Sequence, residues 1–587
     1  MASVDTYIIS FPIPCAESII LRILIMLLLK LSLIVPALLY LISCAVQKSP
    51  GGGPLDRTPP EIEYTNPASD SLGLPLHLER IDLRFSERMD QSSLNNNIYI
   101  SPPLKFETEW DGWDELTLHL QDSLLPEKTY VVSIGAGARD LQKNSMKESL
   151  QFAFSTGTVI DSGSIKGKIF HKEKNKIYNL FAYDLSDSAA FDPLKNKPEY
   201  ITQSGPSGDF NFTYLQLGLY RIMAVEDQNH NLLVDADYEK IGIPVKDVLL
   251  DSALHTAAGL NFQLTKSDTT PPAVISLRSV YRTAVQLRLS EPVSLPAEGE
   301  YSIVDSLKQQ PVNILGFSQD PEKNNIIHFF TDPLDSAARY QLYLKSLEDT
   351  SGNISSKLPL YMFSASAKDD TAGFRLLHHS PKDSSKNLSP RMKVSMEFSL
   401  PVDTASIKTA CILVSAGGDT VSGNWKFPNL FMAEFKPTNF FKPDSSYSSV
   451  LNLSELRNLY NQSIADSVSD YYFSIVPARE MGEISGEAVI QSGQTAPVHL
   501  NVRSLNSRQA PVEIILDRKN TFFVPYMREG KYLIDGFIDL NRDGRFSAGS
   551  LLPFKYSEPF VFGRDTIEVR KRWEKSGVRF AIPREGR

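Results

Sequence analysis

Residues 81–90 of the 587-residue chain read IDLRFSERMD, and this stretch decides the fold class. Apolar and polar side chains alternate from Ile81 to Phe85, so every second residue can enter a core. The alternation recurs in VQLRL at 285–289, and clusters of Gly, Pro, Asn and Ser separate such runs along the chain. Long stretches of helical periodicity are missing after the N-terminal segment. The sequence therefore predicts an all-β protein built from antiparallel sheets.

Three units of about 100 residues contain this kind of strand, and we expect them at 59–158, 270–366 and 373–477. The strand continues as FSERMD at 85–90, LSEPV at 289–293 and FSLPVD at 398–403. These segments resemble the bacterial Ig-like domains of the S-layer SbsA type, whose central strand is followed by Phe-Ser-Glu-Pro-Val/Met-Asp. The second copy departs from that pattern by lacking the Asp, and the third by lacking the Glu. The resemblance implies an Ig-like β-sandwich for each unit.

A second kind of unit is duplicated at 160–266 and 480–583. GSIKG at 163–167 returns as GEISG at 482–486, and the G-x-Y of 218–220 returns at 530–532. An Asp follows nine residues after the Gly in both copies, at Asp227 and Asp539. The two units resemble the transthyretin-like sandwich of carboxypeptidase regulatory domains. The whole chain is thus predicted to be a tandem array of Ig-like and transthyretin-like β-sandwiches.

The N-terminal segment is predicted to be a signal peptide, residues 1–43, with Met26 as an alternative start. LSLIVPALLYLIS at 31–43 carries no charge and has the length of a signal-peptide core. LISC at 41–44 resembles the lipobox of bacterial lipoproteins, which implies cleavage before Cys44 and acylation of its thiol with palmitate-type chains. The alternative is an uncleaved anchor from Ile19 to Val46. Residues 44–58, rich in Gly and Pro, then form a flexible tether.

The net charge and the resemblance to lipoproteins limit where the protein can be located in the cell and what it can bind. The formal net charge is −9, so nucleic acid is not an expected partner. The whole layout, a lipobox Cys, a GGP-x-D-x-x-PP tether and SbsA-type Ig-like domains, resembles that of lipoproteins of Gram-negative bacteria, which implies the cell envelope and an outer-membrane lipid anchor through Cys44. Residues 45–48 contain no Asp or Glu, which favours a periplasm-facing anchor over a surface-exposed one. The other partner is an unknown envelope protein or a glycan.

Two Asp/Asn loops have the spacing of calcium sites. DLNRDGRFS at 539–547 places oxygen ligands at alternate positions and Gly at the sixth. The expected ligands are Asp539, Asn541, Asp543, the Arg545 carbonyl and Ser547. The twelfth position is Ser550 in place of the usual Glu, so only weak Ca²⁺ binding is expected.

The loop at 227–235 matches the spacing of a calcium site less well. It offers Asp227, Asn229, Asn231 and Asp235, but Leu232 stands where Gly belongs. For both loops the alternative is a hairpin connection whose Asp and Asn side chains bond their own backbone without metal. We therefore expect no required cofactor, and at most weak Ca²⁺ binding.

Catalytic motifs are missing from the sequence: there is no G-x-S-x-G, no H-E-x-x-H, no zinc-type Cys pair and no phosphate loop. Cys411, within the apolar run 410–414, is predicted to be a buried core residue. Trp110 and Trp113 are candidate glycan contacts, with packing at a hairpin as the alternative.

The expected function is therefore that of a non-enzymatic cell-envelope lipoprotein, a membrane-tethered β-sandwich stalk for structural or protein-interaction roles. The alternatives are an extracellular glycan-binding or adhesion module with weak calcium binding, and a hydrolase whose site has no recognisable motif.

Overall fold

The computed structural model describes Met26 and residues 56–582, apart from 172, 174, 187–190, 267, 269, 296–299, 465–468, 491–494, 507–509 and 517–519. The chain divides into two compact units, Met1–Thr58 and Pro59–Arg587. The predicted signal peptide, apart from Met26, and Cys44 fall outside the described residues. In the part that is described, no helix combines the length and apolar character needed to cross a bilayer.

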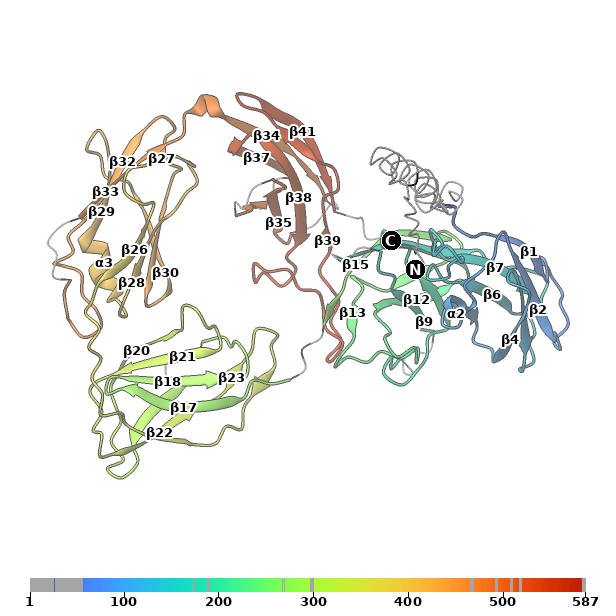
Figure 1. Cartoon of the computed structure of the whole chain (residues 1–587), viewed down its shortest axis with the longest axis horizontal. Coiled ribbons are helices and arrows are strands. Elements are labelled where there is room, and N and C mark those ends of the chain that lie inside the picture. The colour runs from blue at the N-terminus through green and yellow to red at the C-terminus, as the bar shows by residue number, and fades with distance from the viewer. Residues whose placement is uncertain are drawn as a thin grey trace, which may run out of the picture. The chain divides into compact units, whose positions relative to one another are not determined.

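The described part is almost entirely β-structure, which confirms the predicted fold class (Figure 1). Its helical elements are single short pieces: α2 (Gln91–Leu94), α3 (Thr404–Ala410) and the 3₁₀ turn η2 (Ala478–Glu480). The strands group into five successive sandwiches, numbered here by the residues of their strands: 1 (62–155), 2 (163–266), 3 (274–364), 4 (376–475) and 5 (481–581).

Sandwich 1 consists of two antiparallel sheets that enclose one apolar core. The first sheet has the order β1-β2-β5-β4, with β1 (Ile62–Asn66), β2 (Arg80–Phe85), β5 (Glu115–Leu120) and β4 (Phe106–Asp111). The second has the order β3-β6-β7, with β3 (Ile98–Ser101), β6 (Thr129–Ile134) and β7 (Leu150–Ser155). Ile81, Leu83 and Phe85 of β2 are buried in this core, as their alternation predicts. Each fully buried side chain of this size contributes about 1.5–3 kcal/mol.

Sandwiches 3 and 4 repeat the first sheet of sandwich 1 strand for strand. In sandwich 3 the order is β17-β18-β21-β20, with β17 (Val274–Tyr281), β18 (Ala284–Leu289), β21 (Ile326–Thr331) and β20 (Ile314–Gln319). In sandwich 4 it is β26-β28-β31-β30, with β26 (Leu376–Ser380), β28 (Val394–Phe398), β31 (Met432–Pro437) and β30 (Gly423–Asn429). The same topology in three segments matches the repeat seen in the sequence.

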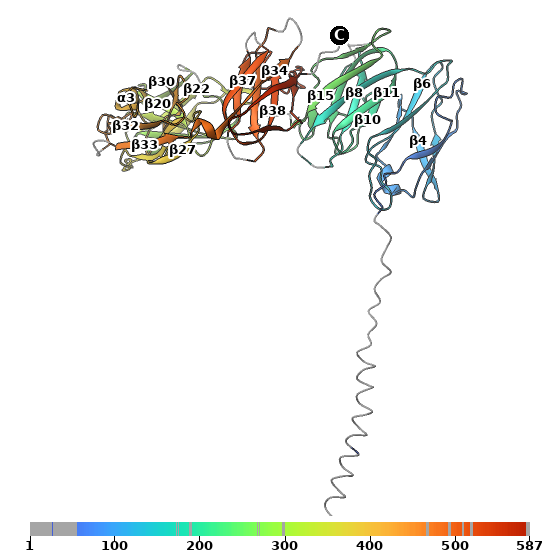
Figure 2. The same ribbon diagram turned by 90° about the horizontal axis from the view of Figure 1, so that it is seen from above.

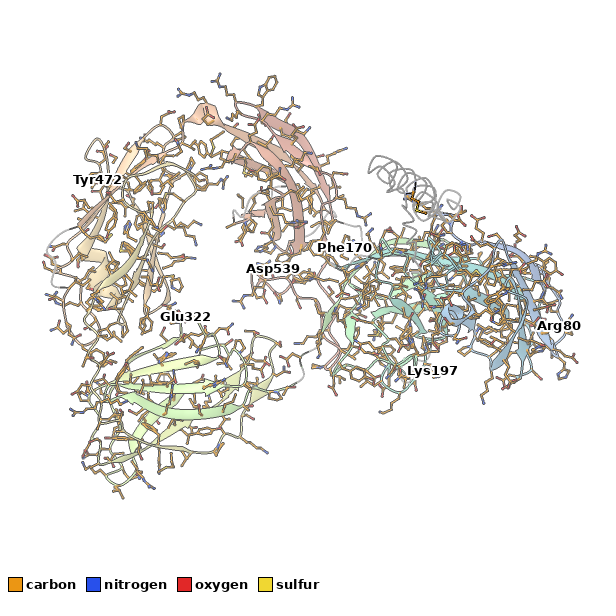
Figure 3. All side chains as sticks on the ribbon, viewed as in Figure 1. Arg80, Phe170, Lys197, Glu322, Tyr472 and Asp539 are labelled. Carbon is orange, nitrogen blue, oxygen red and sulfur yellow. The ribbon has the colours of Figure 1, made fainter. Side chains whose placement is uncertain are left out.

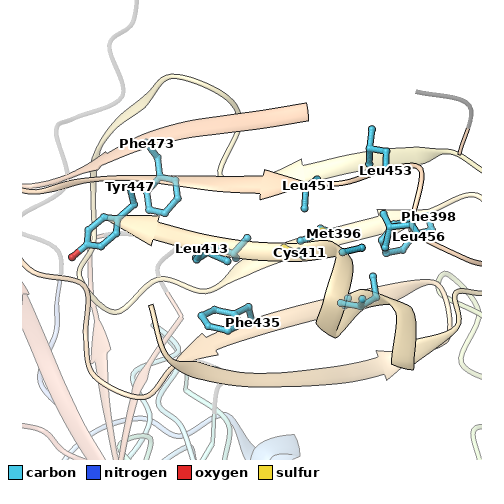
Figure 4. Close-up of a cluster of buried hydrophobic side chains, with 14 of the residues drawn as sticks. Met396, Phe398, Cys411, Leu413, Phe435, Tyr447, Leu451, Leu453, Leu456 and Phe473 are labelled. Atoms are coloured by element: carbon cyan, nitrogen blue, oxygen red, sulfur yellow. The ribbon is translucent and has the colours of Figure 1, made fainter. Parts of the chain in front are cut away.

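The second sheets of these two sandwiches differ slightly. Sandwich 3 has β19 (Tyr301–Asp305), β22 (Arg339–Leu344) and β25 (Tyr361–Ser364), and a separate pair β23 (Leu347–Glu348) and β24 (Ile354–Ser355). Sandwich 4 has the order β27-β33-β32-β29, with β27 (Ser385–Leu388), β33 (Ser469–Ile475), β32 (Ser446–Leu451) and β29 (Cys411–Ser415). Figure 4 shows the core of sandwich 4, where Cys411 lies among apolar side chains of both sheets.

Sandwiches 2 and 5 share a different topology, in which β15 (Thr256–Gln263) runs parallel to β8 (Gly163–Phe170), and β11 (Asp209–Leu215) pairs on the other side (Figure 2). In sandwich 5 the same three places are taken by β41 (Glu574–Ala581), β34 (Met481–Val489) and β37 (Thr521–Arg528).

The second sheets of sandwiches 2 and 5 also correspond. In sandwich 2 the strands are β10 (Tyr200–Gln203), β9 (Asn179–Asp184), β12 (Gly218–Val225), β13 (Lys240–Gly242), β14 (Val248–Leu250) and β16 (Thr265–Lys266). In sandwich 5 they are β36 (Val512–Leu516), β35 (Val498–Ser504), β38 (Gly530–Ile538), β39 (Phe560–Val561) and β40 (Ile567–Val569).

The duplicated G-x-I-x-G segment has a steric reason. A Cβ at Gly167 would lie 1.8 Å from the Leu260 carbonyl oxygen, and one at Gly486 would lie 2.0 Å from that of Val578. Both glycines stand beside an irregularity in the register of the parallel pair, where the two backbones approach closely. Only Gly fits at these two positions.

Sandwiches 1 and 2 share a buried joint. Val131 and Ala153 of sandwich 1 belong to the apolar core of sandwich 2. At the same joint Gln203 Nε2 donates to Asn97 Oδ1 at 2.7 Å and to Asn179 Oδ1 at 3.0 Å. Buried polar groups are stable only when paired in this way, so the joint has a defined geometry.

Candidate functional site

The two Asp/Asn loops occupy the same place in the duplicated fold. The loop of sandwich 2 follows β12 and begins at Asp227, and the loop of sandwich 5 follows β38 and begins at Asp539, which is labelled in Figure 3. Both aspartates are buried, with 8% and 2% of their surface exposed. The duplication seen in the sequence therefore places a buried carboxylate at the start of both loops.

In the sandwich 5 loop, the side chains hold the loop's own backbone. Asp539 Oδ1 accepts the backbone N–H of Asp543 at 3.1 Å, and Oδ2 accepts that of Gly544 at 2.9 Å. Asp543 Oδ1 in turn accepts the N–H of Arg545 at 2.7 Å. His499 Nε2 lies 3.2 Å from Asp539 Oδ2. Both oxygens of Asp539 are thus already engaged.

The sandwich 2 loop has the same turn despite its Leu. Asp227 Oδ2 accepts the N–H of Leu232 at 3.2 Å, the bond that Gly544 makes in the other loop. Leu232 takes a φ of +60°, close to the +76° of Gly544. A non-Gly residue pays about 1–2 kcal/mol for this left-handed conformation. The segment 227–235 therefore folds into the same turn as the loop at 539, even with Leu232 in the Gly position.

Asp235 ties the far side of this loop together. Its Oδ2 accepts hydrogen bonds from Asn229 Nδ2 and Asn231 Nδ2, both at 2.9 Å, and from Tyr238 Oη at 2.7 Å. These donors, Tyr238 first, lower the pKa of Asp235. The same contact raises the pKa of Tyr238 to about 12. The structure thus brings three of the four predicted residues, Asn229, Asn231 and Asp235, into contact with one another, whereas Asp227 contacts Leu232 and Asn179.

A buried glutamate supports each loop, and neither glutamate was predicted from the sequence. Glu239 Oε1 accepts the N–H of Gln228 and Oε2 that of Asp235, each at 3.0 Å. Glu558 makes the equivalent bonds to Leu540 at 2.7 Å and Ser547 at 2.9 Å.

The pKa values of the two glutamates are shifted in the same direction. Burial is the largest cause that raises the pKa of Glu239 and Glu558, and the loop's first aspartate adds to the rise. The only sequence signal for them is a Glu that precedes the returning strand in both copies.

A second acidic group, also missed, lies in sandwich 3. Carboxylate oxygens of Asp268, Glu291 and Asp349 lie within 4.8 Å of one another. Burial, followed by the nearby Asp268, raises the pKa of Glu291. Asp349 is held by Asn353, whose N–H and Nδ2 both donate to it at 2.8 Å.

Two of the three Ig-like repeats carry this acidic group. At sandwich 1 the carboxylate oxygens of Asp56, Glu87 and Asp140 likewise lie within 4.8 Å of one another. Sandwich 4 has Leu400 and Asn458 in place of the Glu and the second Asp. Asn458 still accepts the N–H of Gln462 at 2.8 Å, as Asp349 does that of Asn353. The turn therefore forms without the carboxylates.

The two candidate glycan-contact tryptophans lie in different environments. Trp110 is half-buried on β4 and stacks on Phe85, with ring centroids 6.2 Å apart. Trp113 stands in the turn between β4 and β5 and is 49% exposed. Of the pair, Trp113 is the side chain open to a ligand.

Cys411 is a core residue, as predicted. Burial raises the pKa of its thiol to about 12, and its Sγ lies 3.8 Å from Ser449 Oγ. A thiol with this pKa is almost fully protonated at neutral pH and is a poor nucleophile.

Comparison with known proteins identifies two of the sandwiches. A family model described as a bacterial Ig-like domain matches residues 56–156 and 370–475. No curated protein matches the chain.

Three of the solved structures that match can be compared by their coverage. The N-terminal part of the bacterial S-layer protein SbsC is 13% identical, over 35% of this chain and 44% of that one, with a TM-score of 0.16. Surface layer protein SbsC, domains 1–6, is 9% identical over 87% of this chain and 67% of that one, with a TM-score of 0.15. L,D-transpeptidase 3 from Mycobacterium tuberculosis is 9% identical over 27% of this chain and 76% of that one, with a TM-score of 0.14.

These identities and TM-scores are too low to bear on function. The family model matches the segments that contain FSERMD and FSLPVD. Residues 56–156 and 370–475 are bacterial Ig-like domains, and the chain is an array of β-sandwiches in which they are two members.

Proposed function

We propose that this protein is a non-enzymatic lipoprotein of the bacterial cell envelope, in which Cys44 anchors a series of β-sandwiches that contact another envelope component. The observation that carries the proposal is the pair of bacterial Ig-like domains, which follow a segment resembling a lipobox at 41–44. An Ig-like sandwich is a scaffold that serves many functions, so the role of this one is inferred from its position behind the anchor.

The physical chemistry of the anchor supports this proposal. Two or three acyl chains on Cys44 bury enough methylene groups for stable membrane attachment, whereas one chain gives marginal binding. The tether that follows contains GGGP at 51–54 and cannot pack into a core.

The side chains that looked most reactive in the sequence have structural surroundings. The Cys411 thiol is buried and protonated, and Asp539 holds two backbone N–H groups of its own loop. These contacts favour a scaffold over a hydrolase.

The proposal is tested by cell fractionation combined with cross-linking. Wild-type protein is expected in the membrane fraction, and the Cys44→Ala variant is expected to leave it. Cross-linking in intact cells is expected to recover the same envelope protein repeatedly with the wild type and less of it with the variant. A Cys44→Ala variant that stays fully in the membrane would favour the uncleaved anchor instead.

Glycan binding is a second candidate, favoured by the exposure of Trp113 between two aspartates. An exposed indole face with adjacent carboxylates suits sugar stacking. Retention of the protein on a polysaccharide column, lost in Trp113→Ala but kept in Trp573→Ala, would support it; Trp573 is 72% exposed in sandwich 5 and serves as the matched control.

A further inference from the structure

The strongest unexplained group in the described residues is one oxygen of Asp227. Asp227 Oδ1 is buried and accepts no hydrogen bond, and only 8% of the residue's surface is exposed. The other oxygen, Oδ2, accepts the Leu232 N–H at 3.2 Å and a longer hydrogen bond from Asn179 Nδ2 at 3.5 Å, so the carboxylate lies between β9 and its own loop. A buried carboxylate oxygen without a partner is costly, and buried charges in proteins are paired or coordinate metals.

Two amide oxygens of the same loop are held by backbone hydrogen bonds. Asn229 Oδ1 accepts the N–H of Asn231 at 3.0 Å, and Asn231 Oδ1 accepts that of Leu233 at 2.7 Å. These bonds fix the positions of both oxygens within the loop. Each carbonyl oxygen keeps a second lone pair that can coordinate a cation.

The local charge also calls for a cation. Residues 227–239 contain four carboxylates and no Lys or Arg. Oxygen ligands without nitrogen or sulfur suit a hard cation such as Ca²⁺.

The duplicated loop in sandwich 5 lacks this feature. Both oxygens of Asp539 already accept backbone N–H groups, and His499 lies 3.2 Å away. Arg542 and Arg545 add positive charge within that loop. The better sequence motif therefore stands at 539, but the better electrostatic site stands at 227.

From these contacts we infer that the loop at 227–239 is a Ca²⁺ site, with Asp227 Oδ1 as its central ligand and oxygens of Asn229, Asn231 and Asp235 around it. The usual bidentate Glu is replaced by Tyr238, so binding is weak, with a dissociation constant of about 0.1–1 mM. This inference goes beyond the proposed function and does not depend on the lipid anchor.

The ion would also steady a contact between sandwiches 2 and 5. Val234 and Ala236 of the loop belong to an apolar cluster that includes Leu551 of sandwich 5. Next to it, the Ser557 N–H donates to the Pro244 carbonyl at 3.0 Å. Ordering the loop at 227–239 therefore orders part of the surface on which sandwich 5 packs.

The test uses the full chain, purified in detergent and stripped of metal. Tb³⁺ is the luminescent probe, because Tyr238 lies beside Asp235 and can sensitise its emission. We expect Tyr-sensitised Tb³⁺ emission that Ca²⁺ displaces, and a Ca²⁺-dependent rise in the thermal midpoint. Asp227→Asn is expected to weaken the binding of Tb³⁺ and of Ca²⁺ at least tenfold. The matched variant Asp539→Asn is expected to change both affinities less than twofold.

Two results would overturn the inference: wild-type protein without Ca²⁺-displaceable emission, or loss of binding in Asp539→Asn but not in Asp227→Asn. Circular dichroism without Ca²⁺ checks that Asp227→Asn is folded. If it is not, Asn229→Ala decides the matter, since Asn229 is exposed and its loss removes a ligand without opening the core. Unchanged Ca²⁺ binding in Asn229→Ala would then contradict the site.

Discussion

The buried carboxylate of Glu239 accepts the backbone N–H of Asp235 at 3.0 Å, and through this bond a side chain just before β13 holds the Asp/Asn loop closed. Glu558 holds the loop of sandwich 5 in the same way. In both sandwiches other loop residues lie between the glutamate and the N–H that it accepts. The number of these residues differs between the two copies.

Glu239→Gln is expected to destabilise sandwich 2 by about 1–3 kcal/mol, because one of the two backbone N–H groups then faces an amide NH₂ and loses its acceptor. Hydrogen exchange at the amides of Gln228 and Asp235 should accelerate. Glu322→Gln, an exposed change in sandwich 3, is the control and should leave exchange there unaltered. Unchanged exchange in Glu239→Gln would contradict the role given to this carboxylate.

The same glutamate predicts a pH dependence. Its pKa in the folded state is raised above the ordinary value of 4.5, so the folded protein binds the proton more tightly than the unfolded chain does. The contribution of Glu239 to stability is therefore fully present below pH 4.5 and is lost as the pH rises through the folded pKa. In chelator, the thermal midpoint of the wild type should exceed that of Glu239→Gln by more at pH 4 than at pH 7. A gap that widens with pH would show that the sign is wrong.

Cys411 should be unreactive in the folded protein. In a Cys15→Ser, Cys44→Ser background, a maleimide reagent is expected to label Cys411 at pH 7–8 only after denaturation, because its thiol is buried with a pKa of about 12. Labelling is followed by mass spectrometry. Rapid stoichiometric labelling of the native protein would mean that sandwich 4 is open at this position.

Replacing Trp110 and replacing Trp113 should have different effects on the stability of sandwich 1. Trp110→Ala removes a ring that packs on Phe85 and the core of sandwich 1, so a loss of about 1–3 kcal/mol is expected. Trp113→Ala changes an exposed turn and should stay within about 0.5 kcal/mol. Thermal unfolding of the two variants makes the comparison, and equal losses would place both rings in the core.

An ion pair in sandwich 2 also contacts sandwich 5. Arg221 forms two hydrogen bonds of 2.7 Å to Asp247, and the Tyr556 hydroxyl donates to the same carboxylate at 2.7 Å. Asp247→Ala leaves a largely buried guanidinium unpaired and should cost about 3 kcal/mol. Tyr556→Phe keeps the ion pair and should cost about 1 kcal/mol. Thermal unfolding distinguishes the two, and a larger loss in Tyr556→Phe would contradict this assignment.

Local sequence pattern was sufficient to predict the sheets. Alternation in 81–85 identified the core strand, and the returning G-x-I-x-G identified the duplicated fold, since both features are set by neighbours along the chain. The pattern did not show why Gly167 is required, because the close Leu260 carbonyl lies on a strand far along the sequence.

The candidate site was less accessible from sequence. The spacing of Asp and Asn identified the four oxygen-bearing residues from Asp227 to Asp235. It nevertheless favoured the loop at 539 as a calcium site, because Gly544 occupies the sixth position there. Leu232 adopts the conformation expected of Gly, and whether an aspartate oxygen lacks a donor depends on the folded loop. Glu239, Glu558 and the acidic group around Glu291 were missed because their partners meet only in three dimensions.

The lipid anchor is tested most directly by mass spectrometry of the N-terminus of the protein isolated from its native membranes. We expect a mature chain that begins at Cys44, carries a thioether-linked diacylglycerol and lacks residues 1–43. Recovery of the unmodified tryptic peptide 31–48, with Ser43 still joined to a free Cys44, would contradict it.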